Sequence, residues 1–352
     1  MSGQDDRQSL VKLLHLIPRD GIGGVEVAAK SMLAHTRGDF DFTLLFIEPS
    51  GPIERGPKAI VSIIRENIAT FRRAKIIAPD VILCSLWRSV PLALMLRLVL
   101  RRTKFVFFVH SDVTIHRLDA LLSRLAIYYA DEVWGDSEAT LAIRDVPIDH
   151  AHVISFVTDR LVAPDRHGGR ADFVSWGRLH TQKGIDRSIR LVALLVRRGI
   201  DVRYDVYGPD GGAQNDLEAL ATELGVTAHV RFPGPVSRGD LTAIAAQNRF
   251  FLQLSRSEGM CMAAVEAMQL GLVPVATEVG ELARYVRPGE TGIVVAPDRL
   301  EAAANEIERL IDDDAAWHRL SSAARNRWLK APLYADDVCD AAQALVGRLA
   351  VK

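Results

Sequence analysis

The sequence contains few cysteines and no long uninterrupted apolar stretch. Its three cysteines, Cys84, Cys261 and Cys339, lie far apart, and no C-x-x-C motif occurs. This pattern excludes a disulfide framework and a zinc ribbon, and it favours a reducing compartment. No run approaches the roughly 18 apolar residues typical of a membrane-spanning helix. The polar start, MSGQDDRQSL, lacks the apolar centre of a signal peptide, so we expect a cytoplasmic protein.

The chain also lacks an excess of charge of either sign. Its formal net charge is −1 over 352 residues, which excludes the basic signature of a nucleic-acid-binding protein. Apolar residues make up 49% and charged residues 25%, as is typical of soluble globular proteins. A chain of this length exceeds what one hydrophobic core usually supports, so we expect two domains.

Short apolar runs alternate with helical patterns along the whole chain. The runs in the first half are VKLLHLI (11–17), DFTLLFI (41–47), DVILCSL (80–86), KFVFFVH (104–110) and DEVWGDS (131–137). Those in the second half are ADFVSWGRL (171–179), VRYDVYG (202–208), HVRFPG (229–234), FFLQLS (250–255), LVPVAT (272–277) and GIVVAP (292–297). Such alternation predicts parallel sheets covered by helices on both faces. The number of runs favours two doubly wound sheets, the α/β fold class.

The boundary between the sheets is predicted in LVAPDRHGGRAD (161–172), which carries proline, paired glycines and charges. We therefore expect Rossmann-like domains over 1–165 and 166–330. Pro332 separates two helical patterns, at about 315–329 and 334–349, so residues 331–352 form a final helix.

One segment has a local excess of positive charge. The stretch from Arg65 to Lys104 contains nine basic residues and two acidic ones. Within it, VPLALMLRLVLRRTK (90–104) predicts a very apolar helix with a basic end. Two interpretations remain open. The helix packs in the core with its arginines complementing the helix dipole, or it contacts an anionic membrane surface.

Two loops carry residues suited to phosphate. In GIGG (21–24), adjacent glycines let the backbone approach a ligand at a helix N-terminus. This is not the dinucleotide fingerprint, because Glu26 occupies the third glycine position. In WGRLHTQKG (176–184), Arg178 and Lys183 lie between a strand and a helix, where two cations suit a phosphate. The alternative is that both are exposed loop charges.

The segment SRSEGMCMAAVEAMQLG (255–271) predicts a helix capped by Ser255 or Ser257 and ended at Gly271. At 100° per residue, Glu258 and Glu266 are about 80° apart and look toward one side. Glu266 lies among small apolar residues, where a carboxylate requires a donor. A ligand diol is one candidate donor. A cation on another element, or solvent, is the alternative.

These motifs together resemble a known family. In order and spacing, GRLxxxKG, VYGPDGG, RFPGPV, SRSEGMCMAAVEAMQLGLVPVAT and GETGIVV are similar to the nucleotide-sugar domain of the family 4 glycosyltransferases. These are retaining enzymes of the GT-B architecture, with two Rossmann-like domains around a deep cleft and a final helix that crosses back to the first domain. The resemblance is strong over 173–297 and looser before 150, where IGGVEVAAKSM, FVHSD and DEVWGDSEAT carry it.

The resemblance implies a role for each matching residue. Arg178 and Lys183 would hold the donor diphosphate, Glu266 would accept from the ribose hydroxyls, and Glu258 would contact the transferred sugar. The backbone of Gly259, Met260, Cys261 and Met262 would line that sugar, Gly23 and Gly24 would approach the phosphates, and His110 would lie near the sugar. His110, Arg178, Lys183 and Glu258 are thus the candidate catalytic residues.

The chain also departs from the family pattern. Glu281 and Arg284, in VGELAR, replace the paired glycines and glutamate often found there. In FVHSD, Ser111 separates His110 from Asp112.

The resemblance implies transfer, with retention, from a UDP- or GDP-linked sugar to a glycan or lipid-linked acceptor. We expect neither a cofactor nor a metal. Asp-x-Asp pairs bind metal in another glycosyltransferase architecture, but the matches here, Asp39/Asp41 and 312–314, lie outside the donor context. The enzyme would act in the cytoplasm, as a peripheral protein on the inner face of the plasma membrane. The alternatives are a nucleotide-sugar epimerase, or a silent subunit that binds nucleotide sugar.

Overall fold

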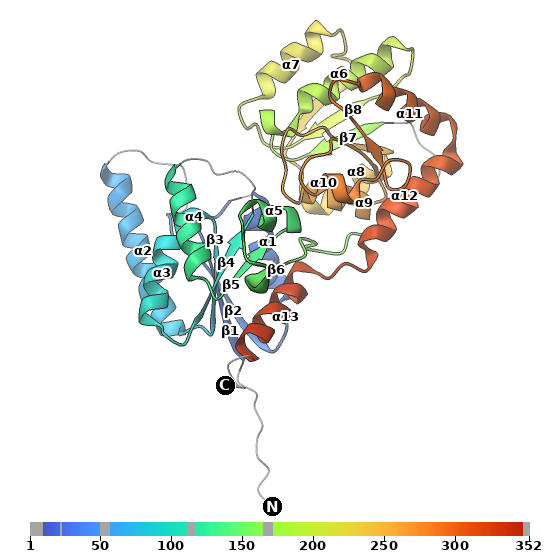
Figure 1. The fold of residues 1–352 in the computed structure, drawn as a ribbon. Helices are drawn as coiled ribbons and strands as arrows, with labels where there is room; N and C mark the ends of the chain where they lie inside the picture. The colour runs from blue at the N-terminus through green and yellow to red at the C-terminus, as the bar shows by residue number, and fades with distance from the viewer. Residues whose placement is uncertain (1–9, 22, 50–56, 111–116, 165–171, 348–352) are drawn as a thin grey trace, which may run out of the picture. The chain divides into compact units, whose positions relative to one another are not determined.

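The computed structural model of the chain describes residues 10–21, 23–49, 57–110, 117–164 and 172–347. The signal-peptide prediction, the centre of the predicted linker and the Ser111/Asp112 departure therefore lie outside the described residues. The chain divides into two compact units. Unit 1 comprises Met1–Asp159 and Pro332–Lys352, and unit 2 comprises Arg160–Ala331 (Figure 1).

Unit 1 is built on a six-stranded parallel sheet with the order β2-β1-β3-β4-β5-β6. Its strands are β1 (Val11–Ile17), β2 (Phe40–Phe46), β3 (Val81–Ser85), β4 (Lys104–Val109), β5 (Glu132–Gly135) and β6 (Ala151–Val153). Apolar side chains on β1, β3 and β4 are buried on both faces, as a parallel sheet requires. The strand order reverses between β1 and β3, so their carboxyl ends border a crevice.

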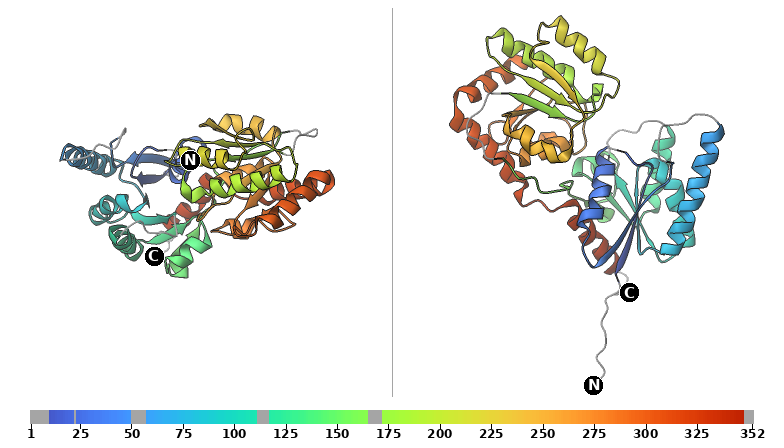
Figure 2. Two further views of the ribbon diagram at one scale, coloured as in Figure 1. Left: turned by 90° about the horizontal axis from the view of Figure 1, so that it is seen from above. Right: turned by 180° about the vertical axis from the view of Figure 1, so that it is seen from behind.

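Helices cover both faces of this sheet. They are α1 (Gly24–His35), α2 (Pro57–Ile77), α3 (Val90–Val99), α4 (Arg117–Tyr129), α5 (Glu138–Ile143) and α13 (Tyr334–Gly347). The helices α2, α3 and α4 lie side by side along one face, and α1 packs beside α13 (Figures 1 and 2). Buried residues such as Leu14, Ile82, Phe105, Leu96 and Ala126 form the core between the sheet and α2–α4.

Unit 2 repeats this plan with the order β12-β11-β10-β7-β8-β9. Its strands are β7 (Phe173–Trp176), β8 (Tyr204–Tyr207), β9 (Val230–Gly234), β10 (Phe250–Gln253), β11 (Val273–Ala276) and β12 (Ile293–Val294). Every pairing is parallel. Here the order reverses between β7 and β10, and this is the switch point of unit 2.

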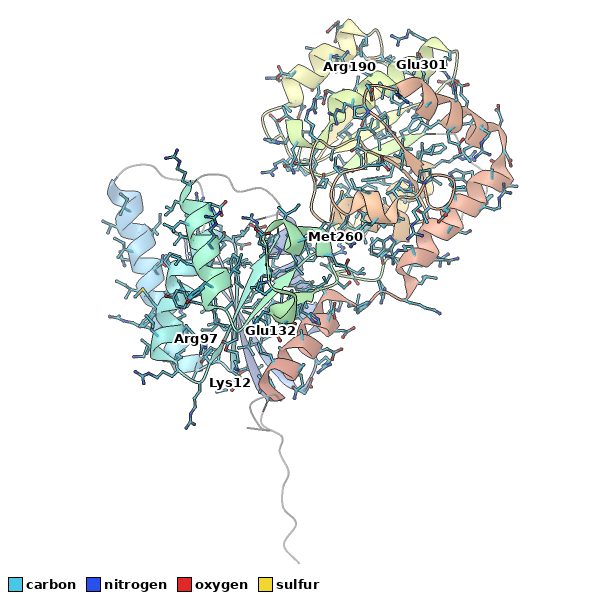
Figure 3. The ribbon with its side chains drawn as sticks, in the orientation of Figure 1. Lys12, Arg97, Glu132, Arg190, Met260 and Glu301 are labelled. Atoms are coloured by element: carbon cyan, nitrogen blue, oxygen red, sulfur yellow. The ribbon has the colours of Figure 1, made fainter. Side chains whose placement is uncertain are left out.

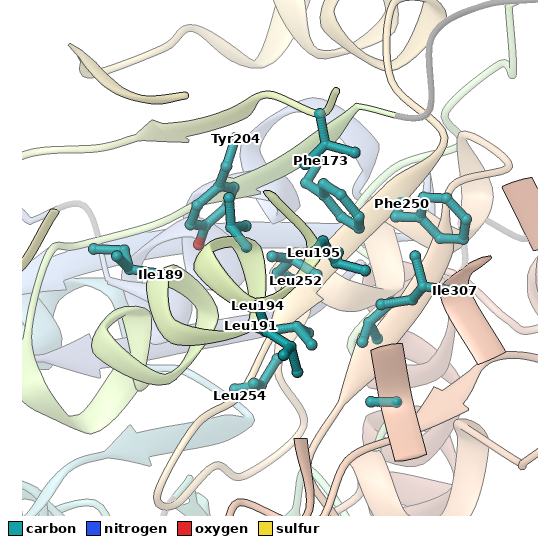
Figure 4. Close-up of a cluster of buried hydrophobic side chains, with 14 of the residues drawn as sticks. Phe173, Ile189, Leu191, Leu194, Leu195, Tyr204, Phe250, Leu252, Leu254 and Ile307 are labelled. Atoms are coloured by element: carbon teal, nitrogen blue, oxygen red, sulfur yellow. The ribbon is translucent and has the colours of Figure 1, made fainter. Parts of the chain in front are cut away.

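The helices of unit 2 are α6 (Ile185–Arg197), α7 (Gln214–Glu223), α8 (Leu241–Ala246), α9 (Met262–Gln269), α10 (Leu282–Tyr285), α11 (Leu300–Asp312) and α12 (Asp314–Leu329). One core cluster joins the sheet to α6 and α11 (Figure 4). Phe173 stacks on Phe250 at a centroid distance of 5.3 Å, with Leu195 and Ile307 beside them.

The predicted pair of doubly wound parallel sheets is confirmed, and each predicted run contains one strand. Sequence reasoning missed β6, a short strand with two exposed residues. The predicted helix over 90–104 is wrong in its last five residues. The amide of Leu100 bonds to Leu96 O to close α3, a turn follows, and Lys104 already belongs to β4. No described helix has both the length and the apolar composition needed to cross a membrane.

The final helix, α13, is anchored by one aromatic residue. Tyr334 is fully buried, and its ring lies 5.4 Å from Phe156 and 6.1 Å from Phe108. Its amide donates to Val157 O at 2.7 Å. Its hydroxyl finds no hydrogen-bond partner among the described residues. In unit 2, by contrast, the buried Tyr204 hydroxyl lies 2.7 Å from Ser175 Oγ.

These two tyrosines provide a matched test of the packing. Tyr334→Phe removes a buried hydroxyl without a partner, so we expect the free energy of unfolding to stay level or rise. Tyr204→Phe removes a satisfied hydroxyl and should lower it by about 1 kcal/mol. Denaturant titrations of both variants and the parent chain would measure the difference. A larger loss for Tyr334→Phe than for Tyr204→Phe would contradict this account of α13.

Candidate functional site

The switch point of unit 2 brings two loops together. The loop after β7 (177–184) carries Arg178 and Lys183, and the loop after β10 (254–261) carries Glu258. Neighbouring parallel strands end at the same edge of the sheet, so their loops share one crevice. The residues alone left the two motifs separate and only the family resemblance assigned both to one donor; the sheet order makes them neighbours.

The two loops are joined by an ion pair between Lys183 and Glu258. Lys183 Nζ lies 2.8 Å from Oε1 and 3.1 Å from Oε2 of Glu258. The Glu258 side chain is only 6% exposed, and it also accepts from Ser255 Oγ at 2.6 Å and Gln253 Nε2 at 3.0 Å. These donors offset the cost of burying a carboxylate.

The same surroundings keep Lys183 charged. Burial acts to lower the pKa of Lys183, but the charge and hydrogen bonds of the neighbouring Glu258 carboxylate act against it, and the pKa lies above its ordinary value. The exposed Arg178 is close enough for its charge to act against that rise. Burial raises the pKa of the Cys261 thiol to about 12, so this cysteine is no thiolate at neutral pH. The crevice therefore presents two cations and one compensated carboxylate.

Further bonds fix the two loops to each other. Gln182 Nε2 donates to Ser257 O at 3.0 Å, and Arg256 forms a bidentate pair with Asp186 at 2.8 Å. Gly184 has φ +62°, and a Cβ there would lie 1.9 Å from Leu254 O. Only glycine permits this approach, so the GRLxxxKG spacing has a structural reason.

The predicted helix over 255–271 is wrong in its first seven residues. The helix α9 begins at Met262, because Cys261 adopts the left-handed region with φ 55° and ψ 70° and interrupts the helical path. Glu258 thus lies in a loop, and the angle of about 80° to Glu266 does not apply. Ser255 does not cap α9 but donates to Glu258. The predicted stop is confirmed, since α9 ends before Gly271 at φ +75°.

The loop after β10 is supported from behind by the segment that follows β11. Tyr285 Oη donates to Met260 O at 2.8 Å, and the Glu281 amide donates to Gly259 O at 3.1 Å. Met260 is labelled in Figure 3. The amides of Met262 and Ala263, in the first turn of α9, have no acceptor among the described residues. Free first-turn amides at a helix N-terminus favour an anion.

Protein groups already pair with Glu266 in the structure. Trp176 Nε1 donates to its Oε2 at 3.0 Å, and Arg238 lies 3.4 Å from its Oε1. The Glu266 side chain is 14% exposed. Of the alternatives left open by the sequence, the structure shows the cation on another element. Nothing in the local sequence signals Arg238, which lies 28 positions earlier, in the turn after β9.

The atypical segment after β11 carries a weak pair of its own. Arg284 lies 3.7 Å from Glu281 Oε1, and that oxygen is buried without a hydrogen bond among the described residues. Arg284 is exposed. The pair lies in the segment whose Glu281 amide and Tyr285 hydroxyl donate to the loop after β10.

The glycine loop of unit 1 is occupied by a carboxylate. Gly23 precedes α1, and Gly24 is its first residue. A methyl group on Gly23 would lie 2.5 Å from Glu26 Oε2, so the Glu26 side chain folds back over the helix N-terminus. An acidic side chain there is stabilised by the helix dipole. The same carboxylate would have to move before a phosphate could approach.

His110 belongs to a buried network that sequence reasoning missed. Its Nε2 lies 2.8 Å from Ser85 Oγ, and His15 Nε2 lies 2.8 Å from the same oxygen. The Ser85 hydroxyl has one proton, so it donates to one imidazole and accepts from the other. Both Nδ1 atoms are buried without a partner among the described residues. The two rings thus hold opposite tautomers when both are neutral.

Burial keeps these imidazoles uncharged. It lowers the pKa of His15 to about 3. Burial, with the nearby His15, also holds the pKa of His110 well below its ordinary range. The His110 ring stacks on Phe108 at a centroid distance of 4.2 Å. His110 is therefore suited to give or take a hydrogen bond as a neutral ring.

Metal-ligating residues do not cluster in the described part of the chain. No group of three or more His, Cys, Asp or Glu side chains there could hold a metal ion.

Comparison with known proteins finds similarity over the residues that form unit 2. Residues 162–327 match the family model of the glycosyl transferases group 1. The chain is 31% identical over 153 residues to a GDP-mannose:cellobiosyl-diphosphopolyprenol alpha-mannosyltransferase of Xanthomonas oryzae, covering 42% of this chain and 40% of that protein. It is 32% identical over 148 residues to an alpha-D-kanosaminyltransferase of Streptomyces kanamyceticus, covering 42% and 38%. The matched region thus spans about two fifths of these relatives.

Solved structures share the whole two-unit fold. HepE of Anabaena in complex with UDP and glucose has a TM-score of 0.78 at 17% identity, covering 96% of this chain and 100% of that one. A sucrose-phosphate synthase of Thermosynechococcus elongatus has a TM-score of 0.78 at 19% identity, covering 97% and 100%. The predicted GT-B fold is therefore confirmed.

The buried histidine network predicts a particular acid sensitivity. His15 has a pKa of about 3 in the folded chain and about 6.5 when unfolded, so the unfolded state binds more protons between these values. Stability is then full above about pH 6.5 and falls as the pH drops. His15→Gln keeps a donor near Ser85 but removes this titration. We expect the pH slope of the unfolding free energy, between about pH 5 and 6, to shrink by roughly 1 kcal/mol per pH unit.

The control for this titration is His318→Gln, at an exposed position of α12. Its slope should match that of the parent chain. Equal slopes for His15→Gln and the parent would show that His15 takes up a proton as readily in the folded chain as in the unfolded chain.

Proposed function

We propose that this chain, whose residues 162–327 match the family model of the glycosyl transferases group 1, transfers a sugar from a nucleoside-diphosphate sugar to a glycan or lipid-linked acceptor. The observation that carries the proposal is the Lys183–Glu258 pair beside Arg178 and the free amides of α9. This site combines two cations and a helix N-terminus with carboxylates, at the switch point where open parallel sheets bind ligands. A diphosphate and sugar hydroxyls are the complementary groups.

Each part of the donor then has a partner in unit 2. Arg178, Lys183 and the amides of Met262 and Ala263 bind the diphosphate. Glu258, oriented by Ser255 and Lys183, accepts from hydroxyls of the transferred sugar.

Glu266 accepts from the ribose diol. Trp176 holds this carboxylate in place, and the ribose hydroxyls replace Arg238 at Oε1. Arg238 is then free to contact the nucleotide. In unit 1, Glu26 has to move aside before Gly23 and Gly24 can approach a phosphate, and the neutral His110 ring can hydrogen-bond a sugar hydroxyl.

The reaction requires stabilisation of the leaving diphosphate. As the bond between the anomeric carbon and the phosphate oxygen breaks, negative charge grows on that oxygen. Preorganised cations and helix amides stabilise this charge without reorganisation. The same groups could replace a metal ion, so we propose a reaction that requires neither metal nor cofactor. A chelator should then leave the rate unchanged.

We propose transfer with retention of configuration. The Glu258 carboxylate is engaged by three side chains, which disfavours its use as a nucleophile. The acceptor oxygen would instead bond to the anomeric carbon from the side that the phosphate leaves, and the acceptor proton would pass to the departing phosphate. Product analysis by NMR would distinguish an α from a β linkage.

The names of similar proteins suggest which donor and acceptor to propose for this chain. Two similar mannosyltransferases are named for GDP-mannose and a lipid-linked cellobiose acceptor, and one similar structure contains UDP-glucose. We propose a uridine or guanosine diphosphate sugar as donor, a lipid-linked or polysaccharide intermediate as acceptor, and a peripheral location at the cytoplasmic face of a membrane. An epimerase or a silent binding subunit would release no nucleoside diphosphate with an acceptor present, so that assay separates the candidates.

Lys183 provides the sharpest test of the transfer chemistry. Lys183→Ala removes a cation from the leaving group, and we expect the turnover rate to fall by about 100-fold or more. Arg190→Ala, at an exposed position on α6 (Figure 3), removes the same charge from the same unit and should leave the rate unchanged. Release of nucleoside diphosphate measures both. Turnover at the parent rate in Lys183→Ala would refute the phosphate role.

Glu266 can be tested by binding alone. Glu266→Gln should weaken the binding of UDP or GDP by about tenfold or more, because it loses charge-assisted hydrogen bonds to the ribose. Binding of inorganic pyrophosphate, which has no ribose, should stay the same. Glu223→Gln, exposed on α7, is the matched control. Calorimetric titration measures all three proteins, and an equal loss for pyrophosphate would remove Glu266 from the ribose.

A further inference from the structure

The exposed apolar residues of this chain gather on three helices of unit 1. Large apolar side chains that are at least 36% exposed number five on α2, three on α3 and five on α4. They are Ile60, Val61, Ile64, Ile68 and Ile76; Met95, Leu98 and Val99; Leu118, Leu121, Leu125, Tyr128 and Tyr129. Only six others occur in the rest of the described chain. We call the surface formed by these thirteen residues the α2–α4 surface.

The fold itself does not require this exposure. Unit 2 has the same doubly wound plan, yet among its described residues only Val162 and Leu329 are exposed large apolar side chains. Both lie near the ends of the unit rather than on a helix face over the sheet. An exposed apolar patch of this extent marks an interaction site.

On α2, the apolar residues share their side with cations. At 100° per residue, Ile60, Ile64 and Ile68 lie within an arc of about 80°. Arg65 and Arg72 follow directly beside that arc. Thr70, about 160° from Ile68, marks the inner side, because its Oγ1 donates to Phe46 O at 3.0 Å. The apolar side of α2 is therefore held outward.

The helix α4 shows the same division more sharply. Its five exposed apolar residues fall within an arc of about 100°. Asp119, Ser123 and Ala126 are buried on the opposite side. Arg117 and Arg124 border the apolar arc. A helix with an apolar stripe, flanking arginines and tyrosines at its edge is typical of a membrane interface.

The helix α3 lies between α2 and α4 and makes the surface continuous. Its own inner side is buried in the core at Leu92 and Leu96. Arg97 is not available to a partner molecule, because it pairs with Asp131 at 3.1 Å and donates to Thr103 O (Figure 3). The interpretation of this helix as a core helix is confirmed by its buried residues, and its exposed residues complete the surface.

The positive charge of the α2–α4 surface favours a negatively charged binding partner. Eight exposed basic residues lie on these helices or in the turn after α3, against the single exposed acidic residue Glu66 among the described residues there. They are Arg65, Arg72, Arg73, Lys75, Arg101, Arg102, Arg117 and Arg124. A second copy of the chain, paired through this surface by a twofold axis, would place these like charges against each other. An anionic lipid surface complements both the charges and the apolar side chains.

We propose that the α2–α4 surface binds an anionic lipid bilayer, with the apolar side chains of α2 and α4 inserted at the headgroup boundary. This deepens the proposed function by naming the partner that brings a lipid-linked acceptor to unit 1. Lipid binding needs no turnover, so its failure and the failure of the proposed reaction can be told apart.

The test measures binding of the full chain to phosphatidylcholine vesicles, with and without phosphatidylglycerol, by flotation. We expect binding only to the anionic vesicles, and weaker binding at high salt. Ile64→Ser on α2 and Leu121→Ser on α4 should each lower the partition coefficient by about tenfold, since each removes one inserted side chain. Arg101→Gln with Arg102→Gln should lower it by at least tenfold.

Two controls make the result specific. Leu33→Ser, at a 65% exposed position on α1, removes an equivalent apolar side chain outside the surface and should leave binding unchanged. Circular dichroism establishes that each variant is folded. Absence of binding to anionic vesicles would overturn the proposal, as would equal losses for Leu33→Ser and Leu121→Ser. Self-association that Leu121→Ser abolishes, without lipid binding, would assign the surface to a second copy instead.

Discussion

The candidate site depends on one interaction, the ion pair between Lys183 and Glu258. It joins the loop after β7 to the loop after β10, across the point where the sheet order reverses. A buried carboxylate without a cation would be costly, and so would a half-buried ammonium without an anion. Each group therefore fixes the other, and both are set before any ligand arrives. A diphosphate and a sugar could then replace solvent without first organising the loops.

The second carboxylate, Glu266, is held by different contacts from those of Glu258. Glu266 is held by Trp176 from β7 and paired loosely with Arg238. The first contact is short and lies within the sheet edge, while the second is longer and comes from a separate turn. A ligand diol can exchange with the longer contact at little cost, because Arg238 is partly exposed and can be solvated. Glu258 is thus fixed by Lys183, whereas a ligand could displace Arg238 from Glu266.

The sequence was sufficient for the sheets because parallel strands, buried on both faces, are continuous apolar runs. The family resemblance, rather than the spacing alone, implied one site for Lys183, Glu258 and Glu266; the structure joins Lys183 to Glu258 and holds Glu266 against Trp176. The sequence could not reveal that Cys261 adopts a left-handed conformation, since MCMAAVEAM has an unbroken helical composition. Nor could it reveal Arg238 beside Glu266, or His15 beside Ser85 and His110. Those pairs join residues 28 to 95 positions apart, and only the packing of the sheet brings them together.

The two units share a fold but differ in how many large apolar side chains they leave exposed. Among the described residues of unit 2, only Val162 and Leu329 are exposed large apolar side chains. Unit 1 leaves apolar stripes on α2 and α4 and surrounds them with arginines. A helix over a doubly wound sheet needs only one apolar side, so a second apolar side lowers solubility without adding to the core. Its presence on two helices, with α3 completing the surface between them, is what the proposed contact with an anionic bilayer would explain.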